Sequence, residues 1–415
     1  MESLCLYETL GTNFTGGVQV INEERGIIYK LHFIFLVLIF ISLDSVVFNI
    51  PYAHILRWIY PIFLILLISK KMGKILYPKG SLWLAIAVMF IIASLYSINI
   101  GYSFGRVFSY LIMTLFFFMF YRYQSNHHTL INIPYYFGKG FIVYEVANFF
   151  STITGGWVRA AGITGNANSL GIWSNIAFVF SIYYIKNAKI LKIKYLYVVI
   201  AMMSVYTAIA SGSRTYTICI LLNISIFFIV MFQSKIKYLV LIAVILFICI
   251  DITSILNSLY HLPGFQRLIE EGSSRGAIWE AGLSLWKQKP IFGWGYGVNQ
   301  ELNSIEYLGY ISGYADYGFA FHNSYLSTII EVGVVGLFII LMHYVLIIFK
   351  GLKIYVKTKN ITVFTVIWLC INMFLCFIGS SAMTSLGSTE GFLFWGLLMW
   401  LYVYIYYDNC LGESV

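Results

Sequence analysis

The chain has 415 residues, of which 60% are hydrophobic, 19% aromatic and only 10% charged. This composition excludes an ordinary soluble globular protein. The formal net charge of +9 would suit nucleic acid, but the lysines lie in short loops between apolar stretches, where they set membrane orientation. Nucleic acid is therefore not expected as a partner.

Apolar stretches long enough to cross a bilayer recur along the whole chain. We predict an all-α polytopic membrane protein with about 12 transmembrane helices. The predicted spans are roughly 29–48, 52–69, 81–99, 104–121, 128–150, 168–185, 193–211, 214–233, 238–257, 325–349, 361–380 and 391–407. The residues before the first span are polar and do not resemble a cleavable signal peptide, so we expect that span to act as its own insertion signal.

Lysines and cysteines indicate the orientation and the redox context. Lysines concentrate in the loops 70–80, 186–194, 234–237 and 350–360, so these loops and both termini are predicted to be cytoplasmic. The cysteines are Cys5, Cys219, Cys249, Cys370, Cys376 and Cys410. Each lies in a predicted span or near an inward terminus, so neither a disulfide framework nor a zinc site is expected.

The longest predicted loop, 257–324, lies on the outward side and separates the spans of 1–256 from those of 325–415 within one membrane domain. A long ordered loop is usually functional. Ser273 or Ser274 suits a helix start, and Pro290 a helix end. Between them Trp279, Leu283 and Trp286 follow at helical spacing, which predicts a helix lying at the membrane interface.

Arginines are distributed against the rule that the lysines follow. Six of the eight are predicted at outward ends or loops: Arg57, Arg106, Arg159, Arg214, Arg267 and Arg275. A guanidinium fork matches phosphate geometry. This distribution favours an outward-facing site for an anionic, lipid-linked substrate.

His322 is the second residue of the pattern Phe-His-Asn-Ser-Tyr-Leu at 321–326, at the outward start of the tenth predicted span. A neutral imidazole there can accept a proton from a sugar hydroxyl, whereas the alternative is an interfacial histidine bonded to a carbonyl. Glu331 follows nine residues later, deep in the predicted span by helix rise. Its carboxylate either tunes the site or bonds a neighbouring helix.

Four other outward features have both a functional and a structural interpretation. Arg214, in a tight Ser-Gly-Ser-Arg-Thr connection, either meets a specific phosphate or reaches ordinary headgroups. Arg275 either adds a donor at a helix N-terminus or is solvated. The amides of Asn166 and Asn168 either bond sugar hydroxyls or cap the next helix. The Gly-Trp-Gly-Tyr-Gly sequence at 293–297 either stacks on sugars or forms a plain turn.

Taken in order, these motifs resemble those of the bacterial O-antigen ligase and O-antigen polymerase superfamily of membrane glycosyltransferases. The matching segments are Gly-x-x-Gly-Asn-x-Asn at 162–168, Ser-Arg-Thr at 213–215, Arg-x-x-x-Trp at 275–279, Pro290 with Phe-Gly-x-Gly at 292–295, and His-Asn-x-x-Leu running into Glu-x-Gly-x-x-Gly at 322–336. They span about half the chain. The amino-terminal spans match only as hydrophobic segments.

The resemblance implies a GT-C-like fold and a metal-independent transfer, without a cofactor, of a glycan from undecaprenyl pyrophosphate on the periplasmic side of the inner membrane. By this resemblance Arg214 and Arg275 hold the pyrophosphate leaving group, and His322 activates the acceptor hydroxyl. Residues expected to contribute to substrate binding are Arg159, Asn166, Asn168, Asn323, Arg267, Trp279, Tyr325 and Glu331. The expected partners are the lipid-linked donor and acceptor, membrane lipids and a chain-length regulator.

Two activities of this superfamily compete. A ligase passes the glycan to lipid A–core, and a polymerase passes it to another carrier-linked repeat unit. Many ligases have a second histidine two residues before the His-Asn histidine, where this chain has Ala320, and this favours a polymerase. A polymerase-type arginine with ten intervening residues before a glycine is absent, since counting from Arg275 gives Trp286. A polyprenyl-glycan or solute transporter is the alternative of another class, but the outward-only arginines argue against it.

Overall fold

The computed structural model describes residues 31–32, 34–48, 50–78, 82–155, 160–231, 275–302 and 321–408. Within these ranges the chain is helical and has no strand, in agreement with the all-α prediction. The α-helices are Ile34–Asp44, α2 (Ala53–Met72), α3 (Leu82–Leu95), α4 (Ile100–Asn126), α5 (Ile133–Gly155), α6 (Ala167–Asn187), α7 (Leu191–Ala210), α8 (Arg214–Met231), α12 (Arg275–Gln288), α13 (Asn299–Leu302), α14 (Ser324–Thr358), α15 (Ile361–Cys376) and α16 (Thr389–Val403). The 3₁₀ turns are η1 (Leu130–Asn132) and η2 (Gly162–Thr164), and a π turn is η3 (Tyr404–Asp408).

Every predicted span except 238–257, which lies outside the described residues, overlaps one of these helices. Within the described ranges, four helices are long and apolar enough to cross a bilayer: α2, α4, α7 and α14. The chain is therefore a helical membrane protein. The number of about 12 spans stays a prediction.

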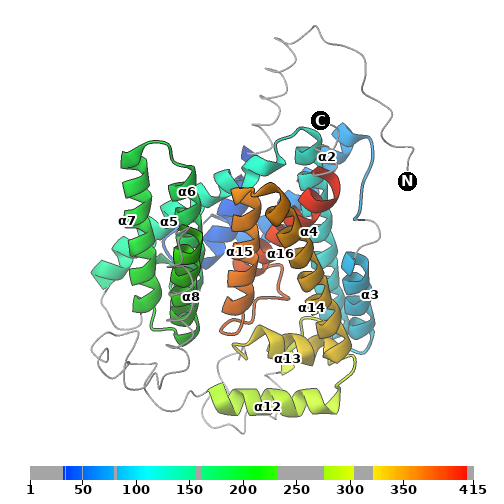
Figure 1. Cartoon of the computed structure of the whole chain (residues 1–415). Coiled ribbons are helices and arrows are strands. Elements are labelled where there is room, and N and C mark those ends of the chain that lie inside the picture. The colour runs from blue at the N-terminus through cyan, green and yellow to red at the C-terminus, as the bar shows by residue number, and fades with distance from the viewer. Residues whose placement is uncertain are drawn as a thin grey trace.

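Helix α12 lies across one end of the bundle, with α13 beside it (Figure 1). This end is named the α12 end. The connection between α7 and α8 lies at the same end, whereas that between α6 and α7 lies at the opposite one (Figure 1). Lys186 and Lys357, in the last turns of α6 and α14, mark the opposite end. The α12 end also carries lysines, because Lys287 lies in the last turn of α12 and Lys289 follows that helix. The orientation derived from the positive-inside rule therefore stays a prediction.

Short polar side chains fix where several helices begin. In each case the side-chain oxygen accepts a backbone N–H of the first turn, which has no partner within the helix. The residues that do this are Asn99, Asn166, Asn323, Asn360 and Ser388, at the starts of α4, α6, α14, α15 and α16. The helix starts are therefore encoded locally, by single residues in an otherwise apolar sequence.

A buried amide network joins α6, α8 and α15. Asn223 donates to Asn175 and to Asn372, both at 2.8 Å, and accepts from the indole N–H of Trp368 at 2.8 Å. Bonds between buried amides require a specific alignment of the helices that carry them. The network therefore sets the position of α8, whose first residue is Arg214, against α15.

A buried carboxyl group joins α5, α6 and α7 in the same way. Glu145 accepts from Ser174 at 3.2 Å and from Thr207, whose hydroxyl oxygen lies 2.8 Å from that of Ser174. A carboxyl inside a bilayer must find such partners. Glu145 is thus a structural link between helices.

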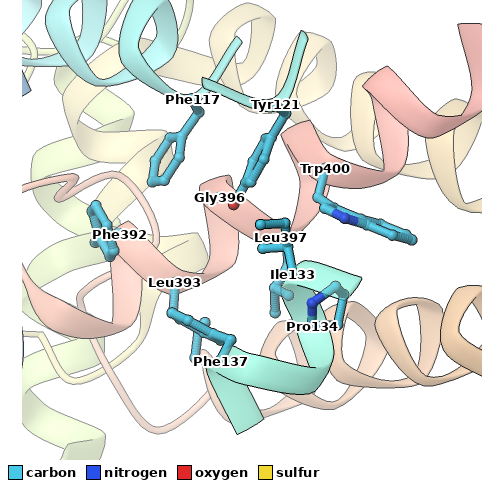
Figure 2. A pocket seen from close by; sticks show the side chains of 10 residues that line it. All are labelled: Phe117, Tyr121, Ile133, Pro134, Phe137, Phe392, Leu393, Gly396, Leu397 and Trp400. Carbon is cyan, nitrogen blue, oxygen red and sulfur yellow. The ribbon is translucent and has the colours of Figure 1, made fainter. Parts of the chain in front are cut away.

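The interior between α4, α5 and α16 is filled by apolar side chains (Figure 2). The residues that line this space are Phe117, Tyr121, Ile133, Pro134, Phe137, Phe392, Leu393, Gly396, Leu397 and Trp400. The hollow left among them is about 10 Å³, enough for no more than about one water molecule. This region is packing and leaves no room for a glycan.

Candidate functional site at the α12 end

Helix α12 packs against α14 through one face. Ile278, Ala281 and Leu285 are buried, and a Cβ on Gly282 would come 2.9 Å from the Leu326 side chain. The spacing of these residues is that of one helix face. The helix ends at Gln288, as predicted from Pro290.

The apolar stripe predicted on α12 is not the face that packs on the protein. Leu283 is 46% exposed, and Trp279 and Trp286 are half-buried. The prediction was of a helix whose apolar stripe lies at the membrane interface. The helix is confirmed, and its placement at a membrane interface stays a prediction. Ala281 and Gly282, on the packed face, are small enough to let α12 approach the start of α14 closely.

His322 lies two residues before α14, in a conformation that non-glycine residues rarely adopt. Its φ is +49°, and its side chain is half-buried. Asn323 follows, and its side-chain oxygen accepts from Tyr325 N at 3.0 Å and Leu326 N at 3.1 Å. On the other side, Phe321 is 1% exposed and its carbonyl accepts from the Trp279 indole at 2.9 Å. His322 is thus held between two anchored neighbours.

The segment 377–388, between α15 and α16, supports this entry to α14. Ser324 N donates to Phe377 O at 2.9 Å, and Ser324 Oγ donates to Ser380 O at 2.7 Å. A Cβ on Gly379 would come 2.9 Å from Thr215 Oγ1. The residue after Arg214 and the residue two after His322 therefore contact the same short segment.

Helix α14 is interrupted at Gly333, whose φ is +68° and ψ −176°. The connection 289–295 fills the break. Trp294 N donates to Ile330 O at 2.8 Å, Gly295 N to Glu331 O at 3.0 Å, and Val334 N to Pro290 O at 2.9 Å. Backbone groups that the break removes from the helix ladder therefore find partners in the loop.

Glu331 lies in this break. Its carboxylate accepts from Asn299 Nδ2 at 2.5 Å and from Thr384 Oγ1 at 3.2 Å, and the guanidinium of Arg106 lies within electrostatic reach. The sequence placed Glu331 deep in an unbroken span. Because α14 is broken and covered by 289–302, the carboxylate instead joins the loop, α14 and the segment 377–388.

The glycine-rich sequence 293–297 is an internal turn. The Tyr296 ring stacks on Phe90 with centroids 3.8 Å apart, and its hydroxyl donates to Thr384 O at 2.6 Å. Burial raises the pKa of Tyr296. The Trp294 indole donates to Leu285 O at 2.8 Å. These contacts support the prediction of a plain turn over that of a sugar-stacking platform.

A shallow apolar groove runs between α12 and the start of α14. Its volume is about 280 Å³, and its lining residues are Trp279, Leu283, Asn323, Tyr325, Leu326, Ile329 and Leu337. Tyr325 contributes its ring, since its hydroxyl donates to Phe374 O. Three residues predicted to bind substrate, Trp279, Asn323 and Tyr325, therefore share one groove beside His322.

The other predicted site residues have varied placements. Arg214 is half-buried and starts α8, as predicted. Asn166 accepts from Asn168 N at 2.8 Å and caps α6, which is the structural interpretation given above. The backbone of Arg275 starts α12. Arg159 and Arg267 lie outside the described residues, as do Ser273 and Ser274.

Sequence reasoning missed the segment 377–388 and with it Thr384, which bonds Glu331. A signal was available. The stretch is rich in glycine, serine and threonine between two apolar spans, and small polar residues at a membrane surface suit a connection that packs closely against its neighbours. The contacts of Arg57 with Gly387 O and of Arg106 with Tyr102 OH were also missed, although both arginines were predicted to face outward.

A comparison with protein families gives one match. The family described as O-antigen ligase matches residues 198–341. This match covers about a third of the chain and supports a relationship to the O-antigen ligase and polymerase superfamily. The matched range includes Arg214, Arg267, Arg275, His322 and Glu331.

The range leaves Arg159, Asn166 and Asn168 outside. A search of curated proteins found no match. The family match supports ligase- or polymerase-type activity in general, and the long apolar helices support a membrane protein.

Proposed function

We propose that this protein is a polysaccharide polymerase that transfers a glycan from undecaprenyl pyrophosphate to a sugar hydroxyl of another carrier-linked repeat unit. The observation that carries the proposal is the family match over 198–341, which contains Arg214, Arg275 and His322. The contacts of Thr215 and Ser324 with one segment, 377–388, support a common site for two of these residues. The active side is proposed to face the periplasm.

In the proposed reaction the acceptor hydroxyl oxygen attacks the anomeric carbon of the donor glycan. The new glycosidic bond forms as the bond from that carbon to the pyrophosphate oxygen breaks, and the oxygen keeps the electron pair. The hydroxyl proton passes to the imidazole of His322. The products are a longer carrier-linked glycan, undecaprenyl pyrophosphate and a protonated histidine that returns its proton to water.

Arg214 and Arg275 are proposed to stabilise the charge that builds on the departing pyrophosphate. Each starts a helix, α8 and α12, and a helix N-terminus adds unpaired N–H groups and the positive end of a dipole. Preorganised donors lower the barrier without a metal ion. His322 is proposed to act from the rigid turn before α14, which fixes the imidazole relative to the acceptor.

A ligase is the second candidate, and the family description favours it. The sequence favours the polymerase, because Ala320 stands where many ligases have a second histidine. The acceptor decides between the two. A transporter would not need a base at the outer entry to α14.

The test uses the purified full chain with carrier-linked repeat units and a chelator of divalent metals. A ladder of longer glycans is expected. Alanine at Arg214, Arg275 or His322 should abolish the ladder, while Arg122→Ala should retain it, because Arg122 lies in the last turns of α4 over the Tyr407 ring.

Lipid A–core offered in parallel separates the two enzymes, since a ligase would extend it and a polymerase would not. If neither acceptor is extended and a labelled solute crosses vesicles containing the protein, the enzymatic proposal is wrong.

A further inference from the structure

Two half-buried arginines at the α12 end have no role in the proposed reaction. Arg57 lies in the second turn of α2, and Arg106 lies in the second turn of α4. The two helices pack side by side, and the two guanidinium groups lie within electrostatic reach of each other. They form a pair that is separate in sequence from Arg214 and Arg275.

Arg57 is fixed by the segment 377–388. Its Nη1 donates to Gly387 O at 2.6 Å, and its guanidinium carbon lies 5.2 Å from the centroid of the Trp58 ring. Its Nε is buried and has no hydrogen-bond partner within the described residues. A buried donor without an acceptor is costly, so this N–H is available to a ligand that reaches the pair.

Arg106 is fixed from the other side. Its Nε and Nη2 donate to Tyr102 OH at 3.1 and 2.7 Å. Its Cγ lies so close to Gly297 that a Cβ there would come within 2.6 Å of it. Glu331 is within electrostatic reach, but its carboxylate bonds Asn299 and Thr384.

The charge of this cluster favours an anion. Within the part of the chain that the structure describes, Glu331 is the carboxylate in electrostatic reach of Arg106, so the two guanidinium groups leave one positive charge in excess. Two guanidinium groups within electrostatic reach of each other repel, and an anion near both reduces that repulsion. The amino-terminal ends of α2 and α4 add positive dipole ends in the same region. Phosphate is the anion that a guanidinium fork matches best in a membrane.

We infer that Arg57 and Arg106 hold the phosphate groups of a second lipid-linked molecule, while Arg214 and Arg275 hold those of the donor. This inference rests on the proposed function. A polymerase must hold two carrier-linked substrates at once, and each brings a pyrophosphate. The second site would take the pyrophosphate of the acceptor.

The segment 377–388 limits the distance between the arginine pair and His322. Near its start, Ser380 supports the entry to α14 beside His322, and near its end Gly387 holds Arg57. Ser380 and Gly387 are at most about 25 Å apart, from the reach of an extended chain. A short oligosaccharide whose carrier pyrophosphate lies on the arginine pair therefore has its distal sugar within reach of the histidine.

The test counts bound undecaprenyl pyrophosphate on the detergent-purified full chain by native mass spectrometry. The wild type is expected to bind two molecules. The double variant Arg57→Gln with Arg106→Gln should bind one, as should Arg214→Gln alone. Arg122→Gln is the matched control, because it removes one arginine from the opposite end of α4, and it should still bind two.

A kinetic measurement complements the count. In the ladder assay, the KM for a labelled acceptor should rise at least about tenfold in the double variant, with the KM for the donor unchanged. Arg57→Lys keeps the charge but not the planar fork and should give a smaller rise. This milder variant keeps the inference testable if the double variant does not fold.

The outcomes separate the inference from the proposed function. Two bound molecules in the double variant, or an equal loss in Arg122→Gln, would overturn the second site even if the wild type makes a ladder. Two molecules in the wild type and one in the double variant uphold it even if no ladder forms. Competition by phosphatidylglycerol at the pair would uphold the phosphate site but assign it to a phospholipid headgroup. Resistance to that lipid assigns it to the carrier.

Discussion

Alanine at Gly333 is expected to separate the connection 289–295 from the break in α14. The added Cβ would lie 2.0 Å from Ile291 O and 2.2 Å from Ile291 C. These are backbone atoms, so no side-chain rotation relieves the contact. Either the loop or the second half of α14 must move, and the loop bonds that surround Glu331 would be lost with it.

The magnitude has two parts. The Gly333 conformation, φ +68° and ψ −176°, is essentially restricted to glycine, and forcing another residue into it costs about 1–3 kcal/mol. Overpacking of a close contact adds about 1–3 kcal/mol more. The free energy of unfolding should therefore fall by about 2–6 kcal/mol.

The assay is a titration of the protein from mild detergent into sodium dodecyl sulfate, followed by tryptophan fluorescence, since Trp294 lies in the affected loop. Gly140→Ala is the matched control, because nothing lies within 4 Å of a Cβ at this position in α5. It should be neutral or stabilising by about 0.5–1 kcal/mol. If Gly333→Ala unfolds at the same sodium dodecyl sulfate concentration as this control, the described packing of 289–295 against Gly333 is wrong.

Three further changes test the described contacts. His322→Gly and His322→Ala should both abolish transfer. The glycine variant should be the more stable of the two, because a left-handed φ costs residues other than glycine roughly 1–2 kcal/mol. Equal stability of the two variants would contradict the φ of +49° at this position. Asn166→Ala should lower the free energy of unfolding by about 1 kcal/mol, because α6 loses its cap. Asn166→Asp should restore both this stability and full activity. Low activity in a stable aspartate variant would instead show that the amide recognises a sugar. Tyr296→Phe should cost about 1 kcal/mol by losing the bond to Thr384 O, measured in the same detergent titration, and an unchanged unfolding midpoint would refute that bond.

Composition and periodicity were sufficient to predict the helical membrane fold and the positions of most helices. The hydrophobic length of a span depends on its own residues and on the bilayer, so it can be read locally. Helix starts could also be predicted from the local sequence. Asn166 and Asn323 act through neighbours two and three residues away, and Pro290 follows the end of α12 as predicted.

The sequence also determined which residues are candidates for chemistry, because arginine, histidine and buried carboxylates are rare in so apolar a chain. It did not determine their partners. Glu331 bonds Asn299 and Thr384, which are 32 and 53 residues away in the chain. No local pattern reports such a pairing.

Only the tertiary structure decided that α14 is broken, that 289–295 fills the break, and that α12 turns its small residues inward. The physical reason is the same in each case. Inside a membrane every backbone group needs a partner, and a broken helix is tolerated only where another part of the fold supplies it. A glycine in a sequence can mark such a break, but its stability depends on which distant segment fills it.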